Sequence, residues 1–147
     1  LPALTKTTGH PSVYWKPVSR HCCMQPGRKP LYFEAPGPAS FMRELSSDEC
    51  KIYLEQAVDK PLLLDVREPW EYRIVHLEDS RLVPMRDIPR VCGELDPEQE
   101  IIVICHHGIR SRHIGLYLEN QGFSNIINLN GGIDAWARNT DRQMPTY

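Results

Sequence analysis

The chain of 147 residues carries 17 basic and 19 acidic residues, which gives a formal net charge of −2. This length suits one compact domain with a tail, and the nearly balanced charge gives no reason to expect a nucleic acid or an anionic membrane as partner. No apolar run approaches the roughly 20 residues of a membrane-spanning helix, and the N-terminus lacks the apolar stretch of a signal peptide. We therefore expect a soluble, cytoplasmic protein.

The five cysteines predict neither a disulfide framework nor a zinc site. Their number is odd, and Cys22 and Cys23 are adjacent rather than spaced as a chelating pair. No Cys/His pair follows at the spacing of a zinc finger. We therefore expect free thiols in a reducing compartment, no metal and no cofactor.

The composition changes near residue 41. Residues 1–41 hold seven of the 13 prolines and five basic residues against one acid. Because prolines at this spacing interrupt any long helix, we interpret residues 1–41 as a tail or extended segment that is dispensable. Residues 42–147 are then the functional domain.

Helix and strand patterns alternate from Met42 onward. Residues 46–49 have the S-x-x-E form of a capping box and predict a helix that ends at about Gln56. The apolar run 62–66 predicts a strand buried on both faces. Residues 68–73 predict a short helix with its proline in the first turn.

The second half of the domain continues this alternation. A loosely patterned helix is expected over 87–95, and the β-branched run 101–104 predicts a second buried strand. A helix follows over 111–120, a third strand over 125–129, and a last helix begins after Gly131 and Gly132. The pattern predicts an α/β fold with a parallel sheet covered by helices on both faces.

Cys105 stands where the second buried strand passes into a helix, in the segment Cys-His-His-Gly-Ile-Arg-Ser. The helix N-terminus supplies partial positive charge and unpaired amides, and Gly108 permits a turn that directs N–H groups inward as an anion nest. Arg110 adds positive potential. These effects favour the thiolate form of Cys105 over the thiol. The same loop could also bind an anionic persulfide formed on this sulfur. The alternative is an inert cysteine that merely ends a strand.

Three segments make the sequence recognisable: 65–72 (DVREPWEY), 105–111 and 129–136 (LNGGIDAW). Together they resemble the single-domain rhodanese (sulfurtransferase) family over about residues 43–147. The resemblance implies a five-stranded parallel sheet flanked by helices. It also implies a ping-pong enzyme in which Cys105 takes a sulfane sulfur from a donor such as thiosulfate and passes it to cyanide or a thiol.

Eight further residues are candidates for binding the substrate anion, because they belong to the cysteine loop or follow the first buried strand: His106, His107, Gly108, Ile109, Arg110, Ser111, Asp65 and Arg67. Arg110 either contacts the anion or pairs with an acid and braces the loop. His106 and His107 either select the donor or are solvated. Asp65 and Arg67 either contact the substrate or form an ion pair at the strand end.

Two other functions compete with sulfur transfer. A cysteine-based phosphatase or arsenate reductase places five residues between cysteine and arginine, whereas four separate Cys105 from Arg110, which suits a sulfane sulfur better than a phosphate. A non-catalytic module that senses redox state or binds a partner is the second alternative. The expected partners are a small sulfane donor and a thiophilic acceptor, with a protein acceptor left open.

Overall fold

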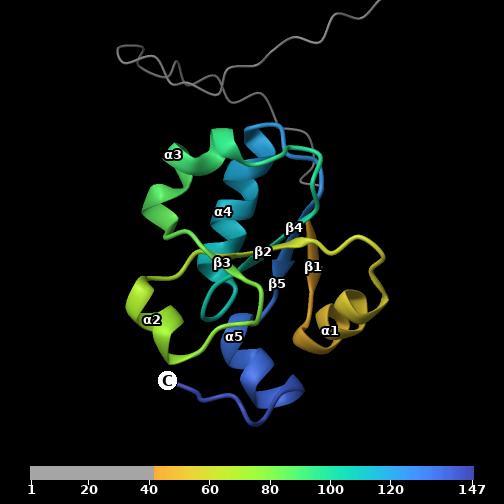
Figure 1. The fold of residues 1–147 in the computed structure, drawn as a ribbon, viewed down its shortest axis with the longest axis vertical. Coiled ribbons are helices and arrows are strands. Elements are labelled where there is room, and N and C mark those ends of the chain that lie inside the picture. Colours follow the sequence, from red (N-terminus) through yellow and green to blue (C-terminus); the bar gives the residue numbers. More distant parts are fainter. Residues whose placement is uncertain (1–41) are drawn as a thin grey trace, which may run out of the picture.

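The computed structural model describes residues 42–147, so the prediction about residues 1–41 lies outside the described part. Five strands form one parallel sheet in the order β1-β5-β4-β2-β3 (Figure 1). The strands are β1 (Arg43–Leu45), β2 (Leu62–Asp65), β3 (Arg81–Leu82), β4 (Ile101–Ile104) and β5 (Ile126–Leu129). The predicted α/β class with a five-stranded parallel sheet is confirmed.

Helices connect the strands and cover both faces of the sheet (Figure 1). The helices are α1 (Ser47–Gln56), α2 (Pro69–Ile74), α3 (Ile88–Val91), α4 (Ile109–Asn120) and α5 (Gly132–Ala135). Short 3-10 turns at Met85–Asp87 and Cys92–Glu94 flank α3, and a π-helical turn at Trp136–Thr140 follows α5. Among the described residues, 42–147, the structure has no helix with the length and apolar character that crossing a membrane requires.

Most predicted helices occur where expected to within about one residue at their ends, and two differ more. The predicted capping box precedes α1: the Ser46 hydroxyl accepts from the Glu49 amide, and the Glu49 carboxylate accepts from the Ser46 amide. Helix α4 begins two residues before the predicted start, because Gly108 takes the N-cap position with a φ of 91°. The helix expected over 87–95 is broken into α3 and two 3-10 turns, since a proline and a glycine interrupt it.

Strands β1 and β3 had no pattern of their own in the sequence. They are three and two residues long and form the two edges of the sheet. Short edge strands with charged side chains are common because they limit pairing with other chains. Only the family resemblance implied these two strands.

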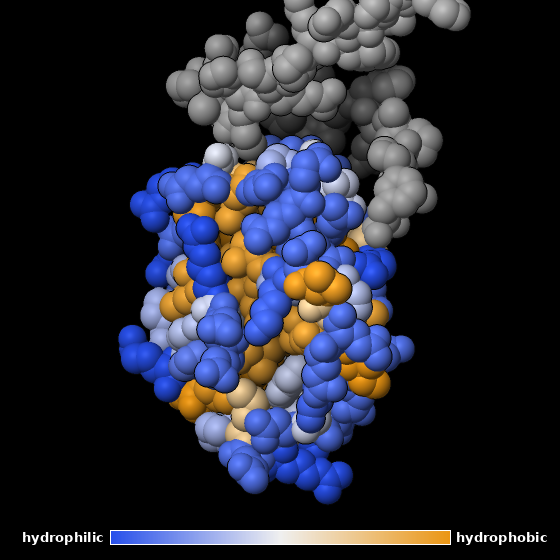
Figure 2. Space-filling view, turned by 45° about the vertical axis from the view of Figure 1, so that its right-hand side comes forward, coloured by the Kyte–Doolittle hydropathy of each residue, from blue (hydrophilic) through white to orange (hydrophobic). Residues whose placement is uncertain are grey.

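The core consists of two apolar layers, one on each face of the sheet. Alternate residues of the central strands point to opposite faces, so Val103 packs with Leu64, Ile114 and Leu118, while Ile102 packs on the other face. The first layer lies under α3 and α4, and the second lies under α1 and α5 (Figure 1). Every residue of β4 is buried, which confirms the predicted strand buried on both faces. Polar residues cover much of the surface in Figure 2, with apolar residues in a band between them.

The sheet order places a crevice at the carboxyl ends of β2 and β4. From β2 the chain proceeds to its neighbour β3 on one side, and from β4 it proceeds to β5 on the other. At such a switch point the connecting segments diverge and leave room for a ligand. Cys105 directly follows β4, so the fold places its loop at this crevice.

Candidate active site

The thiol of Cys105 lies at the bottom of the loop between β4 and α4. The residue is 1% exposed. The Gly108 amide donates a hydrogen bond to Cys105 Sγ at 3.0 Å, and Ser111 Oγ lies 3.3 Å from the same sulfur. The N-terminal turn of α4 follows directly, so its dipole also favours negative charge on the sulfur. The loop therefore places one backbone amide donor and one hydroxyl against the sulfur.

Gly132, which opens α5, permits a close approach that fixes the loop from the other side. A Cβ atom at Gly132 would lie 2.3 Å from the main-chain oxygens of both Cys105 and His106, and Gly132 also has a φ of 61°. The next two amides complete the contact. Ile133 donates to the Cys105 carbonyl at 2.9 Å, and Asp134 donates to the His106 carbonyl at 3.1 Å. Gly132 of the third motif thus allows α5 to pack directly against the cysteine loop.

A buried polar chain connects the sulfur to β5. Ser111 Oγ donates to Asn128 Oδ1 at 2.6 Å, and Asn128 Nδ2 donates to the Gly108 carbonyl at 3.3 Å. Because the hydroxyl hydrogen of Ser111 points to Asn128, its oxygen accepts from the Cys105 thiol in this arrangement. The sequence pattern did not lead us to Asn128 as a site residue, although a polar residue inside an apolar strand could have indicated it.

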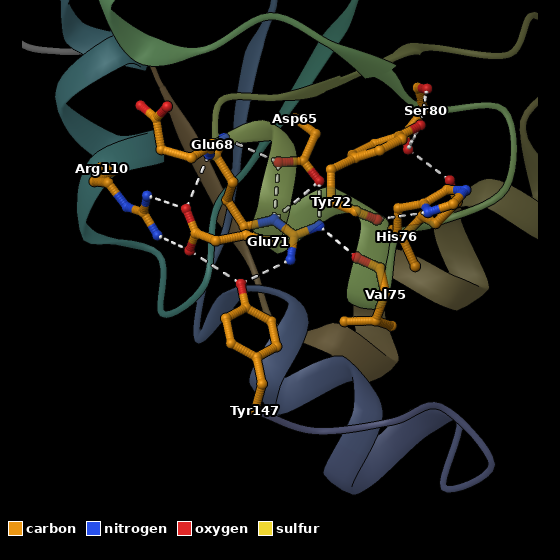
Figure 3. Close-up of polar contacts among 11 residues, drawn as sticks. Asp65, Glu68, Glu71, Tyr72, Val75, His76, Ser80, Arg110 and Tyr147 are labelled. Carbon is orange, nitrogen blue, oxygen red and sulfur yellow. Dashed lines mark hydrogen bonds and ion pairs between the residues drawn. The ribbon is translucent and has the colours of Figure 1, made fainter.

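Arg110 braces the loop instead of facing the sulfur. Its Nη1 and Nη2 atoms donate to the Glu71 carboxylate at 2.7 and 2.6 Å, a bidentate pair (Figure 3). This pairing raises the pKa of Arg110, and it lowers the pKa of Glu71 to about 2. Of the two alternatives for Arg110, the structure supports the ion pair. Arg110 also interacts electrostatically with Cys105, and this interaction contributes to the raised pKa of Arg110.

The Glu71 carboxylate should make stability pH-dependent in the acid range. Because its pKa falls from 4.5 to about 2 on folding, its contribution is complete above about pH 4.5 and is lost as the pH falls toward 2. We expect Glu71→Gln to lower the free energy of unfolding by about 2 kcal/mol at pH 7. The pKa shift alone would correspond to a larger loss of stability. The Arg110 side chain is 36% exposed, however, so solvent screens the ion pair and reduces its contribution.

Urea unfolding of both proteins between pH 3 and pH 7 measures this dependence. The difference in the free energy of unfolding between the native chain and Glu71→Gln should become smaller as the pH falls. The exposed Glu55 of α1 offers a matched control, and Glu55→Gln should change the free energy of unfolding at pH 7 by less than about 0.5 kcal/mol. A constant difference for Glu71→Gln would contradict the assignment.

Asp65 and Arg67, both candidates for anion binding, form a buried ion pair. Both side chains are 0% exposed. Arg67 Nε donates to Asp65 Oδ1 at 2.9 Å, and Nη2 donates to Asp65 Oδ2 at 2.6 Å and to the Val75 carbonyl at 2.7 Å. Arg67 Nη1 donates to the Tyr147 hydroxyl at 2.9 Å. With its guanidinium engaged in this way, Arg67 braces the end of β2, which is the ion-pair alternative.

Tyr147 joins these two ion pairs, and nothing in its sequence context indicated this role. Its hydroxyl accepts from Arg67 and donates to Glu71 Oε1 at 3.0 Å, so Tyr147 lies between the two charged groups (Figure 3). Its ring packs 4.3 Å from the ring of His106 and 5.9 Å from that of Trp70, centroid to centroid. Tyr147 thereby covers one side of the cysteine loop.

A cavity of about 270 Å³ opens onto the loop, lined by Cys105, His106, His107, Ile109 and Arg110. Ile109 is 67% exposed and His107 is exposed, so both are accessible to an incoming molecule. Burial and the neighbouring His107 lower the pKa of His106. Neither Asp65 nor Arg67 lines the cavity.

The fold and the site together define a class of protein: an α/β domain with a buried cysteine at the carboxyl end of the central strand, held in an amide-lined loop. The family model described as "Rhodanese-like domain" matches residues 51–139. The chain belongs to the rhodanese-like domain family.

Relatives and solved structures agree with this assignment. A protein named "Sulfurtransferase" from Allochromatium vinosum is 34% identical over 97 residues, which cover 66% of this chain and 90% of that protein. "Rhodanese-like/PpiC domain-containing protein 12, chloroplastic" from Arabidopsis thaliana is 36% identical over 94 residues, but the match spans only 31% of that relative. A rhodanese-like domain protein from Staphylococcus aureus superposes with a TM-score of 0.61 at 27% identity, covering 67% of this chain and 95% of that chain.

Proposed function

We propose that this protein is a rhodanese-type sulfurtransferase that carries a sulfane sulfur as a persulfide on Cys105. The observation that carries the proposal is the position of the Cys105 sulfur. It accepts a hydrogen bond from the Gly108 amide at 3.0 Å and lies at the base of a small cavity. The relative named a sulfurtransferase supports the same class of reaction. Thiosulfate is the test donor, and the donor in the cell is a separate question.

In the first half-reaction, the Cys105 thiolate attacks the outer sulfur of thiosulfate. A bond forms between Sγ and this sulfur, the sulfur–sulfur bond of thiosulfate breaks, and sulfite leaves with the electron pair. The Gly108 amide and the first turn of α4 stabilise the negative charge of the thiolate before the attack. The bound product is the anionic persulfide, Cys–S–S⁻.

In the second half-reaction, cyanide or a thiolate attacks the outer sulfur of the persulfide. The acceptor leaves as thiocyanate or as a new persulfide, and the electron pair of the broken bond returns to Cys105 as thiolate. The exposed side chains of His107 and Ile109 stand where the donor and the acceptor enter. The donor and the acceptor therefore reach Cys105 through the same opening of the cavity, one after the other, which is consistent with a ping-pong mechanism.

A phosphatase or arsenate reductase fits the site less well. Such chemistry needs an arginine directed at the oxyanion, whereas both branches of the Arg110 guanidinium are directed at Glu71. Among residues 42–147, which the structure describes, the cavity is also lined by two histidines and Ile109, and Arg110 is the one Lys or Arg side chain in its lining. A single outer sulfur needs less space and fewer donors than a tetrahedral oxyanion.

Mass spectrometry of the full chain tests the proposal. Incubation with excess thiosulfate should add about 32 Da, one sulfur atom, to the peptide that contains Cys105. Subsequent cyanide should remove this mass and release thiocyanate in equal amount. An unmodified Cys105 after treatment with several sulfane donors, together with hydrolysis of an aryl phosphate, would overturn the proposal in favour of a phosphatase.

A further inference from the structure

Two adjacent histidines at the mouth of the cavity point their ring nitrogens at each other. His106 Nδ1 and His107 Nδ1 are 3.1 Å apart. The Asp134 carboxylate from α5 joins them, and one ligand atom from each of the three residues lies within 4.8 Å of the others. Two imidazole nitrogens and one carboxylate oxygen form a common ligand set of Zn²⁺ sites that keep an open position.

The hydrogen bonds of His106 fix its tautomer in the form that a metal ligand requires. His106 Nε2 lies 3.1 Å from the main-chain oxygen of Tyr147. Because this oxygen only accepts, Nε2 carries the hydrogen, and the lone pair of Nδ1 is directed at His107. Metal-binding histidines show the same arrangement, in which the second ring nitrogen donates to a carbonyl or carboxylate. A cation between the rings would replace the hydrogen that His107 donates to His106.

The third ligand is held rigidly relative to the first. The Asp134 amide donates to the His106 carbonyl at 3.1 Å, so α5 is hydrogen-bonded directly to the cysteine loop. The Asp134 side chain is 15% exposed, and Arg138 Nε donates to it at 3.0 Å. Such preorganisation lowers the entropic cost of binding a metal ion.

We propose that His106, His107 and Asp134 form a Zn²⁺ site at the mouth of the Cys105 cavity, with the remaining position open to water. His106 and His107 line the cavity of Cys105. A bound Zn²⁺ ion therefore obstructs the approach of reagents to the thiol and inhibits the protein. The inhibition of sulfur transfer rests on the proposed function, whereas the binding and the obstruction do not.

Isothermal titration calorimetry with ZnCl2 tests the binding. The full chain with Cys105→Ser serves as background, so that the thiol itself is no ligand. Adding His107→Ala or Asp134→Asn should weaken the Zn²⁺ affinity about tenfold or more. His113→Ala is the matched control, since His113 is an exposed histidine of α4 outside the cluster, and it should leave the affinity unchanged. Equal affinity in all four proteins would overturn the site.

Alkylation tests the obstruction without any sulfur donor. In chains that keep Cys105, the rate of iodoacetamide modification of its peptide is measured with and without Zn²⁺. Zn²⁺ should slow the modification of the native chain and of His113→Ala, but much less that of His107→Ala and Asp134→Asn. Equal protection in all of them would mean that Zn²⁺ binds the thiol without the cluster and would refute the proposal. A failure of sulfur transfer would leave both readouts unaffected.

Discussion

Replacement of Cys105 by serine should abolish thiosulfate:cyanide sulfurtransferase activity, with a loss of at least about a thousandfold. A serine hydroxyl is a poor nucleophile at neutral pH and forms no persulfide, so neither half-reaction can proceed. The surroundings need not change, because the Gly108 amide and Ser111 can still hydrogen-bond to an oxygen at this position. Steady-state formation of thiocyanate measures the effect.

Cys50 provides the thiol control. Cys50 lies on α1, is 0% exposed and packs into the apolar layer on that face of the sheet, and burial raises its pKa to about 11, so it stays protonated and inert. Cys50→Ala should retain activity within about twofold and lose about 1 kcal/mol of stability through the small cavity left behind. Activity of Cys105→Ser close to that of Cys50→Ala would exclude Cys105 as the sulfur carrier.

Replacement of Arg67 by methionine should destabilise the domain by about 3–5 kcal/mol. Methionine matches much of the volume but leaves the Asp65 carboxylate buried without its counter-charge, and both side chains are 0% exposed in the native chain. The Tyr147 hydroxyl also loses its donor, which loosens its contact with Glu71. Urea unfolding at pH 7 measures the change in the free energy of unfolding.

Arg112 is the matched control for this variant. Arg112 Nε pairs with Glu44 at 2.9 Å, but the two side chains are 60% and 41% exposed. Solvent screening makes such surface pairs weak, so Arg112→Met should cost less than about 1 kcal/mol. The double variant Asp65→Asn/Arg67→Met should regain part of the stability, because it removes the buried charge. Equal losses for Arg67→Met and Arg112→Met would contradict the buried-pair account.

The cysteine loop depends on four elements at once. Strand β4 presents Cys105, and α4 supplies the helix N-terminus. Helix α5 binds the loop carbonyls, and Asn128 of β5 holds Ser111 and Gly108. A site assembled in this way keeps its donors aligned before substrate arrives, which is the property that electrostatic stabilisation requires.

The sequence by itself determined the parts of this protein that depend on neighbours along the chain. The apolar runs over 62–66 and 101–104 predicted the buried strands, because a parallel strand covered on both faces has no polar alternation. The capping residues of α1 and the cysteine loop were likewise readable, since a cap and an anion nest are local in sequence.

Only the tertiary structure decided which distant groups meet at the loop. The Arg110–Glu71 pair, the Tyr147 contacts and the position of Asp134 join residues from separate elements. The edge strands β1 and β3 are too short to show a period, so their pairing partners define them. These features depend on sheet order and helix packing, which bring together side chains that no local pattern relates. The sequence thus pointed to Cys105 as the candidate, and the packing decided what surrounds it.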